Sequence, residues 1–413
     1  MTHASLRLRF AAWTAIACLT LAIALPAVRL HAQEPLPSTQ KTQMRFPAPT
    51  PNDTLQPVEV AADGKVRFRI WAPNANEVKL QTEGPEATPG IKPEDLAKLN
   101  DIPLVKGDQG IWETTIGPIV PGVYLYNFVV DGVKTPDPRN PIAAQTLTAQ
   151  RSVYEVPGAE FSAYKPDVPH GDLHVLFYNS KAVGAMRRLH VYTPPGYENG
   201  TTRYPVLYLL HGAGGADNSW SDQGRAGAIL DNLIAAHKAI PMIVVMPAGH
   251  ISSSFRASGN STIGHDAFNK DLVDDVLPYV DAHFRTLTDR DHRALAGLSM
   301  GGMQTLAISL RNSEKFSWVG VFSSGWVPQA MKEAQDVDLA EYRASGKPFH
   351  LYWFAIGQYD FLLENCHQTV ALLNQNGIKT ELKETGGYHA WTNWRDYLNQ
   401  FAPQLFQPEK GKK

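Results

Sequence analysis

Residues 293–306, RALAGLSMGGMQTL, join one apolar run to a second through a glycine-rich turn. The first run, residues 294–296, has the continuous apolar character of a strand that is buried on both faces of a parallel sheet. Residues 303–310 predict a helix. Between the two lies Gly-x-Ser-x-Gly at residues 297–301, and this spacing places a serine at a strand-to-helix elbow. The stretch therefore predicts an α/β sheet that presents the Ser299 hydroxyl at its edge.

Other buried strands and amphipathic helices accompany this elbow. Four more apolar runs predict strands of the same sheet: Val206–Leu210, Ile243–Met246, Trp318–Phe322 and Leu351–Ile356. Residues 271–284 carry apolar side chains at helical spacing, which predicts a helix on one face of that sheet. Alternating strands and helices of this kind predict an open, mostly parallel α/β domain over residues 166–406.

The preceding hundred residues follow a different pattern, with period two. Short alternating runs separated by turns predict an all-β sandwich over residues 57–157: 66–70, 78–80, 112–116 and 124–130, the last ending at the turn Asp131-Gly132. Four of the aromatic residues in the sandwich either stack on sugar rings or fill its core: Trp71, Trp112, Tyr124 and Tyr126.

The N-terminal residues predict export. Arg7 and Arg9 precede the apolar run 10–25, and Leu30-His31-Ala32 forms an acceptable cleavage site, so residues 1–32 are predicted to be a signal peptide. An uncleaved membrane anchor is the alternative. Residues 33–56, rich in Pro, Gln and Thr, predict a flexible linker. We therefore expect a secreted or periplasmic protein without stable membrane association, whose mature chain keeps Cys366 as its single thiol.

Charge and motifs exclude several function classes. The net charge is −2 and no basic block occurs, so no nucleic-acid partner is expected. The sequence also lacks phosphate-binding, dinucleotide-binding and zinc-protease motifs, so it predicts neither a cofactor nor a metal.

A serine nucleophile needs a base, and in this fold the acid and then the histidine follow the serine along the chain. Three histidines lie downstream of Ser299: His350, His367 and His389. His389 is the candidate base, because it sits in a loop between a predicted strand (378–382) and a predicted final helix (393–401).

The candidate acid is Asp360, since it directly follows a buried strand and carboxyl ends of parallel strands point into the cleft. Glu364 and Glu384 are alternatives. The tetrahedral intermediate also needs two N–H donors, for which the sequence offers Met300, directly after the nucleophile, and Ala213 in the glycine-rich loop 211–215.

Both domains resemble known families. The catalytic resemblance spans residues 172–406 and rests on YPVLYLLHGAGGADNSW (204–220), RALAGLSMGGMQTL (293–306), AIGQYD (355–360) and GGYHAWTNWRDYL (386–398), which are similar to carbohydrate esterase family 1. This resemblance implies an α/β-hydrolase fold and a triad of Ser299, Asp360 and His389. The sandwich, through FRIWAP (68–73), GVYLY (122–126) and PDPRNP (136–141), resembles the immunoglobulin-like carbohydrate-binding module of family 48.

The resemblance, with the predicted export, implies a serine esterase that releases ferulic or related hydroxycinnamic acids from plant xylan. Enterochelin-type siderophore hydrolysis, acetylxylan deacetylation and mycolyl transfer are alternative reactions, and a catalytically inactive carbohydrate-binding protein is an alternative of a different class. Trp220 and Trp391 lie beside the two active-site loops, where they either bind the substrate or pack the loop bases.

Overall fold

The computed structural model describes residues 47–56, 58–85, 101–251 and 266–407. The predicted signal peptide and most of the predicted linker lie outside these residues. The chain divides into two compact units, Met1–Ala48 and Pro49–Lys413, and the second unit contains everything described below. Among the described helices, none has both the length and the apolar character needed to cross a membrane.

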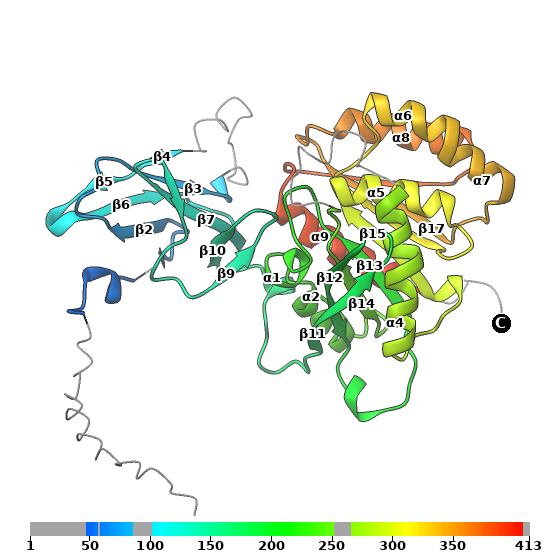
Figure 1. Ribbon diagram of the computed structural model, residues 1–413, viewed down its shortest axis with the longest axis horizontal. Helices are drawn as coiled ribbons and strands as arrows, with labels where there is room; N and C mark the ends of the chain where they lie inside the picture. The colour runs from blue at the N-terminus through cyan, green and yellow to red at the C-terminus, as the bar shows by residue number, and fades with distance from the viewer. Residues whose placement is uncertain (1–46, 57, 86–100, 252–265, 408–413) are drawn as a thin grey trace, which may run out of the picture. The chain divides into compact units, whose positions relative to one another are not determined.

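The N-terminal part of the second unit is an antiparallel sandwich of two sheets (Figure 1). One sheet has the order β1 (Val58–Val60), β2 (Val66–Trp71), β6 (Ile111–Ile116), β5 (Val105–Lys106). The other has the order β4 (Ile102–Pro103), β3 (Val78–Thr82), β7 (Gly122–Val130), β10 (Gln150–Val156), β9 (Ala143–Gln145), with β8 (Val133–Thr135) pairing to β7. The all-β prediction for this region is confirmed.

Three of the four sandwich aromatics considered as sugar-binding candidates are core residues. Trp112, Tyr124 and Tyr126 are buried, and each donates its polar hydrogen to an acceptor inside the sandwich. The Tyr126 ring meets the Phe68 ring edge-on at 5.0 Å. Trp71 is only half-buried, so it is the one of the four that does not belong to the core.

The C-terminal part is an eight-stranded sheet (Figure 1). Its order is β11 (Asp172–Ser180), β12 (Ala185–Thr193), β14 (Ile243–Pro247), β13 (Val206–Leu210), β15 (Arg293–Leu298), β16 (Trp318–Phe322), β17 (Leu351–Gly357), β18 (Glu381–Thr385). The pairs β11·β12 and β12·β14 are antiparallel, whereas every pair from β14 to β18 is parallel. The predicted mostly parallel α/β sheet is therefore confirmed.

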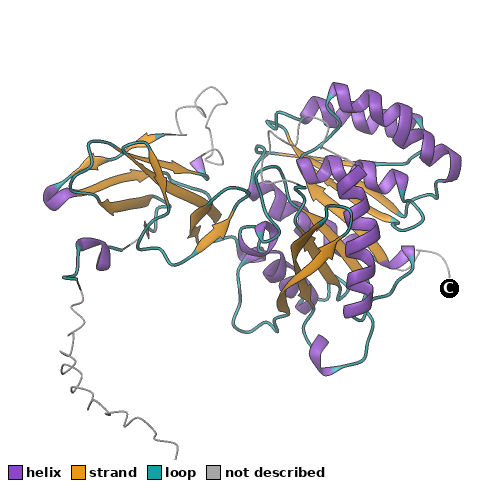
Figure 2. Cartoon of the chain, viewed as in Figure 1, coloured by secondary structure: helices purple, strands orange, loops and turns teal. Residues whose placement is uncertain are grey.

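Helices cover both faces of this sheet (Figure 2). Its α-helices are α1 (Ser219–Asp222), α2 (Ala226–Ala235), α3 (Asp266–Lys270), α4 (Leu277–His283), α5 (Met300–Arg311), α6 (Pro328–Glu333), α7 (Leu339–Ser345), α8 (Leu363–Gln375) and α9 (Trp391–Phe401). Two π-helical stretches (Asp271–Val276, Ala334–Asp338) and short 3-10 turns complete the helical structure. Along β13, Leu207 and Leu209 pack in one core cluster and Tyr208 in another, as expected for a strand buried on both faces.

Several boundaries differ from the sequence prediction. Strand β18 begins three residues later than predicted, because its Glu- and Lys-rich sequence lacks the apolar pattern of the other strands. Helix α5 begins at Met300, three residues early, so Gly301 and Gly302 lie inside its first turn. A glycine is required there, since a Cβ at Gly301 would lie 2.6 Å from the carbonyl oxygen of His211. The antiparallel strands β11 and β12 were not predicted.

Candidate active site

Ser299 occupies the elbow between β15 and α5. Its backbone has φ +51° and ψ −117°, a strained conformation for any residue but glycine. Its N–H donates to Phe322 O at 2.9 Å, and Ser324 Oγ donates to its carbonyl oxygen at 2.8 Å. The turn also needs Gly297, where a Cβ would clash with the backbone of Gly301. These contacts hold the Ser299 side chain at the carboxyl end of the sheet.

The structure brings the three predicted triad residues together in one hydrogen-bonded row. His389 Nε2 lies 2.9 Å from Ser299 Oγ, and His389 Nδ1 lies 2.9 and 3.0 Å from the two carboxylate oxygens of Asp360. The Asp360 carboxylate is buried and also accepts the Leu362 N–H at 2.9 Å. The Asp360 carboxylate accepts a hydrogen bond from His389 Nδ1, so the ring proton sits on Nδ1. Nε2 is therefore free to take the proton of Ser299.

The two alternative acids are engaged elsewhere. Glu364 accepts a hydrogen bond from Gln368, one helical turn further along α8, at 2.7 Å. Glu384 lies 2.8 Å from His367 Nε2, and both of these side chains are exposed. Among the described carboxylates, Asp360 is thus the one that orients His389.

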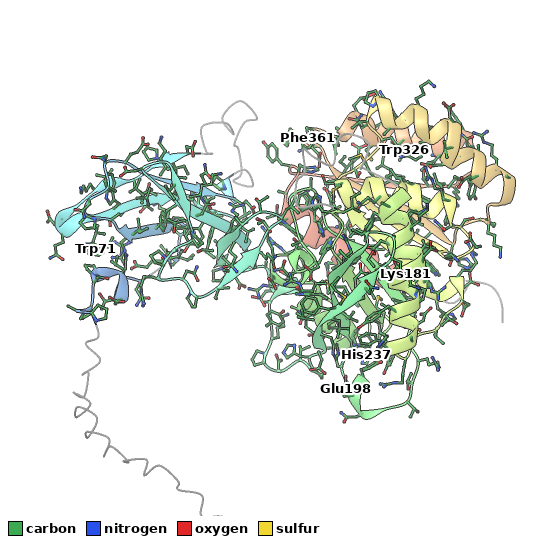
Figure 3. The ribbon with its side chains drawn as sticks, viewed as in Figure 1. Trp71, Lys181, Glu198, His237, Trp326 and Phe361 are labelled. Carbon is green, nitrogen blue, oxygen red and sulfur yellow. The ribbon has the colours of Figure 1, made fainter. Side chains whose placement is uncertain are left out.

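Aromatic rings enclose the His389 imidazole. The Trp394 ring meets it edge-on, with centroids 5.1 Å apart at 89°. Phe361, labelled in Figure 3, has its ring centroid 4.5 Å from that of the imidazole, and it is 73% exposed. The base is therefore partly shielded from water, while an accessible aromatic ring stands directly beside it.

The two candidate oxyanion donors flank the serine. Met300 is the first residue of α5, so its N–H has no acceptor within the helix. Ala213 belongs to the glycine-rich loop after β13, and this loop lines the same cavity as Ser299. Neither N–H donates to another described group, and their use as oxyanion donors stays a prediction.

His211 holds this loop in place. Its Nε2 accepts the Gly249 N–H at 2.8 Å, so the ring proton must sit on Nδ1, which donates to Gly212 O at 2.7 Å. Protonation would break the first bond. Burial lowers the pKa of His211 to about 4, which keeps the ring neutral in the folded protein.

The lowered pKa of His211 predicts that the protein loses stability in acid. An unfolded histidine titrates near 6.5, so the unfolded state binds more protons below that pH, and the contribution of His211 to stability is lost as pH falls from 6.5 toward 4. The lost contribution approaches about 3 kcal/mol. We expect denaturant unfolding to show this extra loss in wild type but not in His211→Asn. The same change at the exposed His237 should leave the pH profile unaltered, and parallel profiles for wild type and His211→Asn would contradict the assignment.

A cavity of about 490 Å³ opens over the serine. From the α/β domain it is lined by the loop 212–215, Ser219, Gln223, Leu298, Ser299, Phe361, His389, Trp391 and Trp394. From the sandwich it is lined by Glu83, Leu125, Ala144, Gln145, Thr146 and Arg151. No sequence pattern indicated the sandwich residues or Phe361. This volume is within the usual range of small-ligand sites.

Polar contacts tie the sandwich to the catalytic domain at this cavity. The Glu83 carboxylate accepts hydrogen bonds from Arg151, at 2.7 Å, and from Gln223 of the α/β domain. Arg395 of α9 is buried and donates to the carbonyl oxygens of Val123 and Gln223 at 3.0 and 3.1 Å. Burial lowers the pKa of Arg395 to about 10. The sandwich is therefore a fixed wall of the cavity rather than a detached module.

The two predicted substrate-binding tryptophans have different positions. Trp391 lines the cavity, and its role in substrate binding stays a prediction. Trp220 does not: it is fully buried, its indole N–H donates to Leu210 O at 3.0 Å, and its ring meets Trp391 edge-on at 5.1 Å. The prediction for Trp220 is wrong because its large apolar ring packs in the core of the sheet and supports Trp391. Within the described chain, no cluster of three or more His, Cys, Asp or Glu residues suits a metal ion.

The elbow serine, the Ser–His–Asp row and the sheet order define an α/β hydrolase. Comparison with known families gives the same class. Residues 180–405 match the family model described as "Putative esterase", and residues 56–142 match "Carbohydrate-binding module 48 (Isoamylase N-terminal domain)". The chain belongs to this esterase family and carries a family 48 module, which confirms both resemblances.

Individual relatives agree with this assignment. An endo-1,4-beta-xylanase/feruloyl esterase of Xylanibacter ruminicola is 33% identical over 370 residues, which cover 86% of this chain and 47% of that protein. The chain thus spans less than half the length of this relative.

Solved structures show the same fold. A carbohydrate esterase family 1 ferulic acid esterase of Anaeromyces mucronatus is 25% identical, with a TM-score of 0.54 over 60% of this chain and 96% of that one. An enterobactin esterase of Shigella flexneri is 17% identical, with a TM-score of 0.60 over 83% and 93%. The second similarity concerns the fold alone, and it extends over both domains.

Proposed function

We propose that this protein is a serine carboxylic-ester hydrolase that releases ferulic or related hydroxycinnamic acids from plant xylan. The observation that carries the proposal is the Ser299–His389–Asp360 row, which opens into a cavity with aromatic side chains beside the nucleophile. The similarity to a xylanase/feruloyl esterase supports the choice of substrate.

The geometry supports acyl transfer in two steps. Ser299 Oγ attacks the ester carbonyl as His389 Nε2 takes its proton, and the resulting oxyanion is stabilised by the N–H groups of Met300 and Ala213. Asp360 stabilises the imidazolium. His389 then gives the proton to the departing alkoxide, so the alcohol leaves and an acyl-enzyme remains. Water, deprotonated by the same histidine, attacks the acyl-enzyme and releases the free acid and Ser299.

The cavity wall favours an aromatic acyl group over acetyl. Phe361, Trp391 and Trp394 present apolar rings next to the catalytic row, and an acetyl group is too small to use them. The opposite wall, from the sandwich, offers the Glu83 carboxylate and the Arg151 guanidinium, which suit the hydroxyl groups of a sugar alcohol. The two walls therefore fit an ester between a phenolic acid and a carbohydrate.

Product release from defined esters tests this proposal. Wild type should release ferulate from methyl ferulate and from feruloylated xylan, as measured by chromatography, and Ser299→Ala should release none above background. Hydrolysis of enterobactin or acetylated xylan in preference to ferulate esters would replace the proposed substrate. Background rates for every ester, with retained xylan binding, would instead show an inactive carbohydrate-binding protein.

Phe361 provides a test of acyl recognition. Phe361→Ala removes a ring contact, for which about 0.5–1.5 kcal/mol is typical, so kcat/KM for methyl ferulate should fall roughly 2- to 12-fold. Hydrolysis of p-nitrophenyl acetate should change little, because acetate does not reach the ring. Tyr359→Ala is a matched control, since Tyr359 is a similarly exposed neighbour that lies outside the cavity lining. Equal losses for both esters would mean that Phe361 only supports His389.

We also propose that residues 1–32 direct export and are then removed. The charged start, apolar run and Leu-His-Ala site support this. N-terminal sequencing of the protein from the culture medium or periplasm should begin at Gln33, whereas a retained Met1 in the membrane fraction would indicate an anchor.

A further inference from the structure

The two edges of the eight-stranded sheet have opposite chemistry. At one edge, β18 places charged side chains at three of its five positions: Glu381, Lys383 and Glu384. Such charges protect an open strand from pairing with another chain. At the other edge lies β11, which has nine residues. Its only ionisable acidic or basic side chains are those of Asp172 and His174. In the described chain β11 pairs with β12 alone, so its second side has unpaired backbone groups.

An apolar stripe accompanies these open backbone groups. Leu173, Val175 and Phe177 occupy alternate positions on one face of β11, and they are 48%, 49% and 62% exposed. Met186 on β12 extends the stripe and is 63% exposed. The helix layer covers the adjoining part of this face, since Tyr192, paired with Leu173, is buried against α2. On this face the helix layer ends before β11, so the apolar side chains of β11 stay exposed.

We infer that β11 is a dimer interface, in which it pairs antiparallel with β11 of a second copy across a two-fold axis at Val175. In this register Val175 lies opposite Val175 of the other copy, and Leu173 lies opposite Phe177. The three exposed apolar residues of β11 therefore pair with one another on the same face. Asp172 falls opposite Tyr178, so the pairing opposes no like charges. Strand addition also pairs the open N–H and C=O groups.

The interface is small. Stable dimers usually bury about 1,200–2,000 Å² in total, whereas this contact uses one nine-residue strand from each copy. We therefore expect a dimer that forms reversibly with protein concentration. The inference concerns assembly and does not depend on the ester that the enzyme hydrolyses.

Sedimentation of the full chain over a range of concentrations tests the interface. Wild type should shift from monomer to dimer as concentration rises, and Val175→Lys should remain monomeric, because two lysines would face each other across the axis. Val133→Lys is the matched control: the same substitution at an exposed sandwich position, which should leave the dimer intact. A wild type that stays monomeric, a dimeric Val175→Lys or a monomeric Val133→Lys would each overturn the inference.

Cross-linking tests the register. In a Cys18→Ser background the remaining native thiol, Cys366, is buried with its pKa raised to about 12, so it resists oxidation. Val175→Cys should form a disulfide-linked dimer, because residues directly opposite have Cβ atoms as close as about 4.5 Å, which a disulfide can span. Leu173→Cys should not, since its two copies would be about 14 Å apart along the strands. Equal cross-linking of both variants would overturn the proposed register.

Discussion

Ser299→Ala should lower kcat for ester hydrolysis by about 10⁶-fold while the protein remains folded. The loss is this large because the hydroxyl forms the acyl-enzyme, and His389 has no other nucleophile within hydrogen-bonding distance in the described structure. The residual rate should reflect only the cavity and its N–H donors. Steady-state hydrolysis of p-nitrophenyl acetate measures the loss, and thermal unfolding checks the fold.

Ser323 supplies a matched control for this variant. It is also a buried serine with positive φ, at +45°, and it follows the adjacent strand β16. Its hydroxyl has no hydrogen-bond partner in the described chain. Ser323→Ala should therefore retain wild-type activity. If Ser299→Ala kept more than about a thousandth of wild-type kcat, a covalent role for Ser299 would be untenable.

Asp360→Asn should lower kcat by about 10⁴-fold without disturbing the position of His389. The expected cause is the wrong histidine tautomer. The amide oxygen will keep the Leu362 N–H, which places the amide NH₂ against His389 Nδ1. Nδ1 then becomes an acceptor and the ring proton moves to Nε2, which can no longer take the proton of Ser299. A pH–rate profile should show the loss across the neutral range.

Glu364→Gln and Glu384→Gln are the controls for the acid. Both carboxylates lie near Asp360 in sequence, and each is bonded to a residue outside the catalytic row. Both variants should keep nearly full activity, whereas a 10⁴-fold loss in either of them would move the acid role away from Asp360.

The fold was predictable from the sequence where burial produces a simple pattern. Strands β13, β15 and β16 are apolar at almost every position because helices cover both of their faces, so a continuous run identified them. Edge strands follow a different rule. β18 is mostly charged, and β11 alternates between exposed residues (Leu173, Val175, Phe177) and inward-facing ones (Leu176, Tyr178), so a test for strands buried on both faces displaced the first strand and missed the second.

The catalytic residues of the candidate site were predictable from the sequence, whereas most of its cavity walls were not. The sequence predicted Ser299, Asp360 and His389 from their order along the chain and from the predicted strand that each of them follows. The walls of the cavity were not predictable in this way. Glu83 and Gln223 are 140 residues apart and meet only through packing of the two domains. Trp220 was misassigned because proximity to a catalytic loop does not tell whether a ring faces the cavity or the core.

The shared cavity has a consequence for gene fusion and domain exchange. Six cavity residues come from the sandwich, and Arg395 of the catalytic domain bonds the sandwich backbone. A recombination joint placed between the two domains would therefore separate the two walls of the cavity over Ser299. Transplanting the catalytic domain alone would leave one wall of that pocket open to solvent and deprive a buried cation of its sandwich acceptor. A graft that keeps the cavity intact must therefore carry both domains.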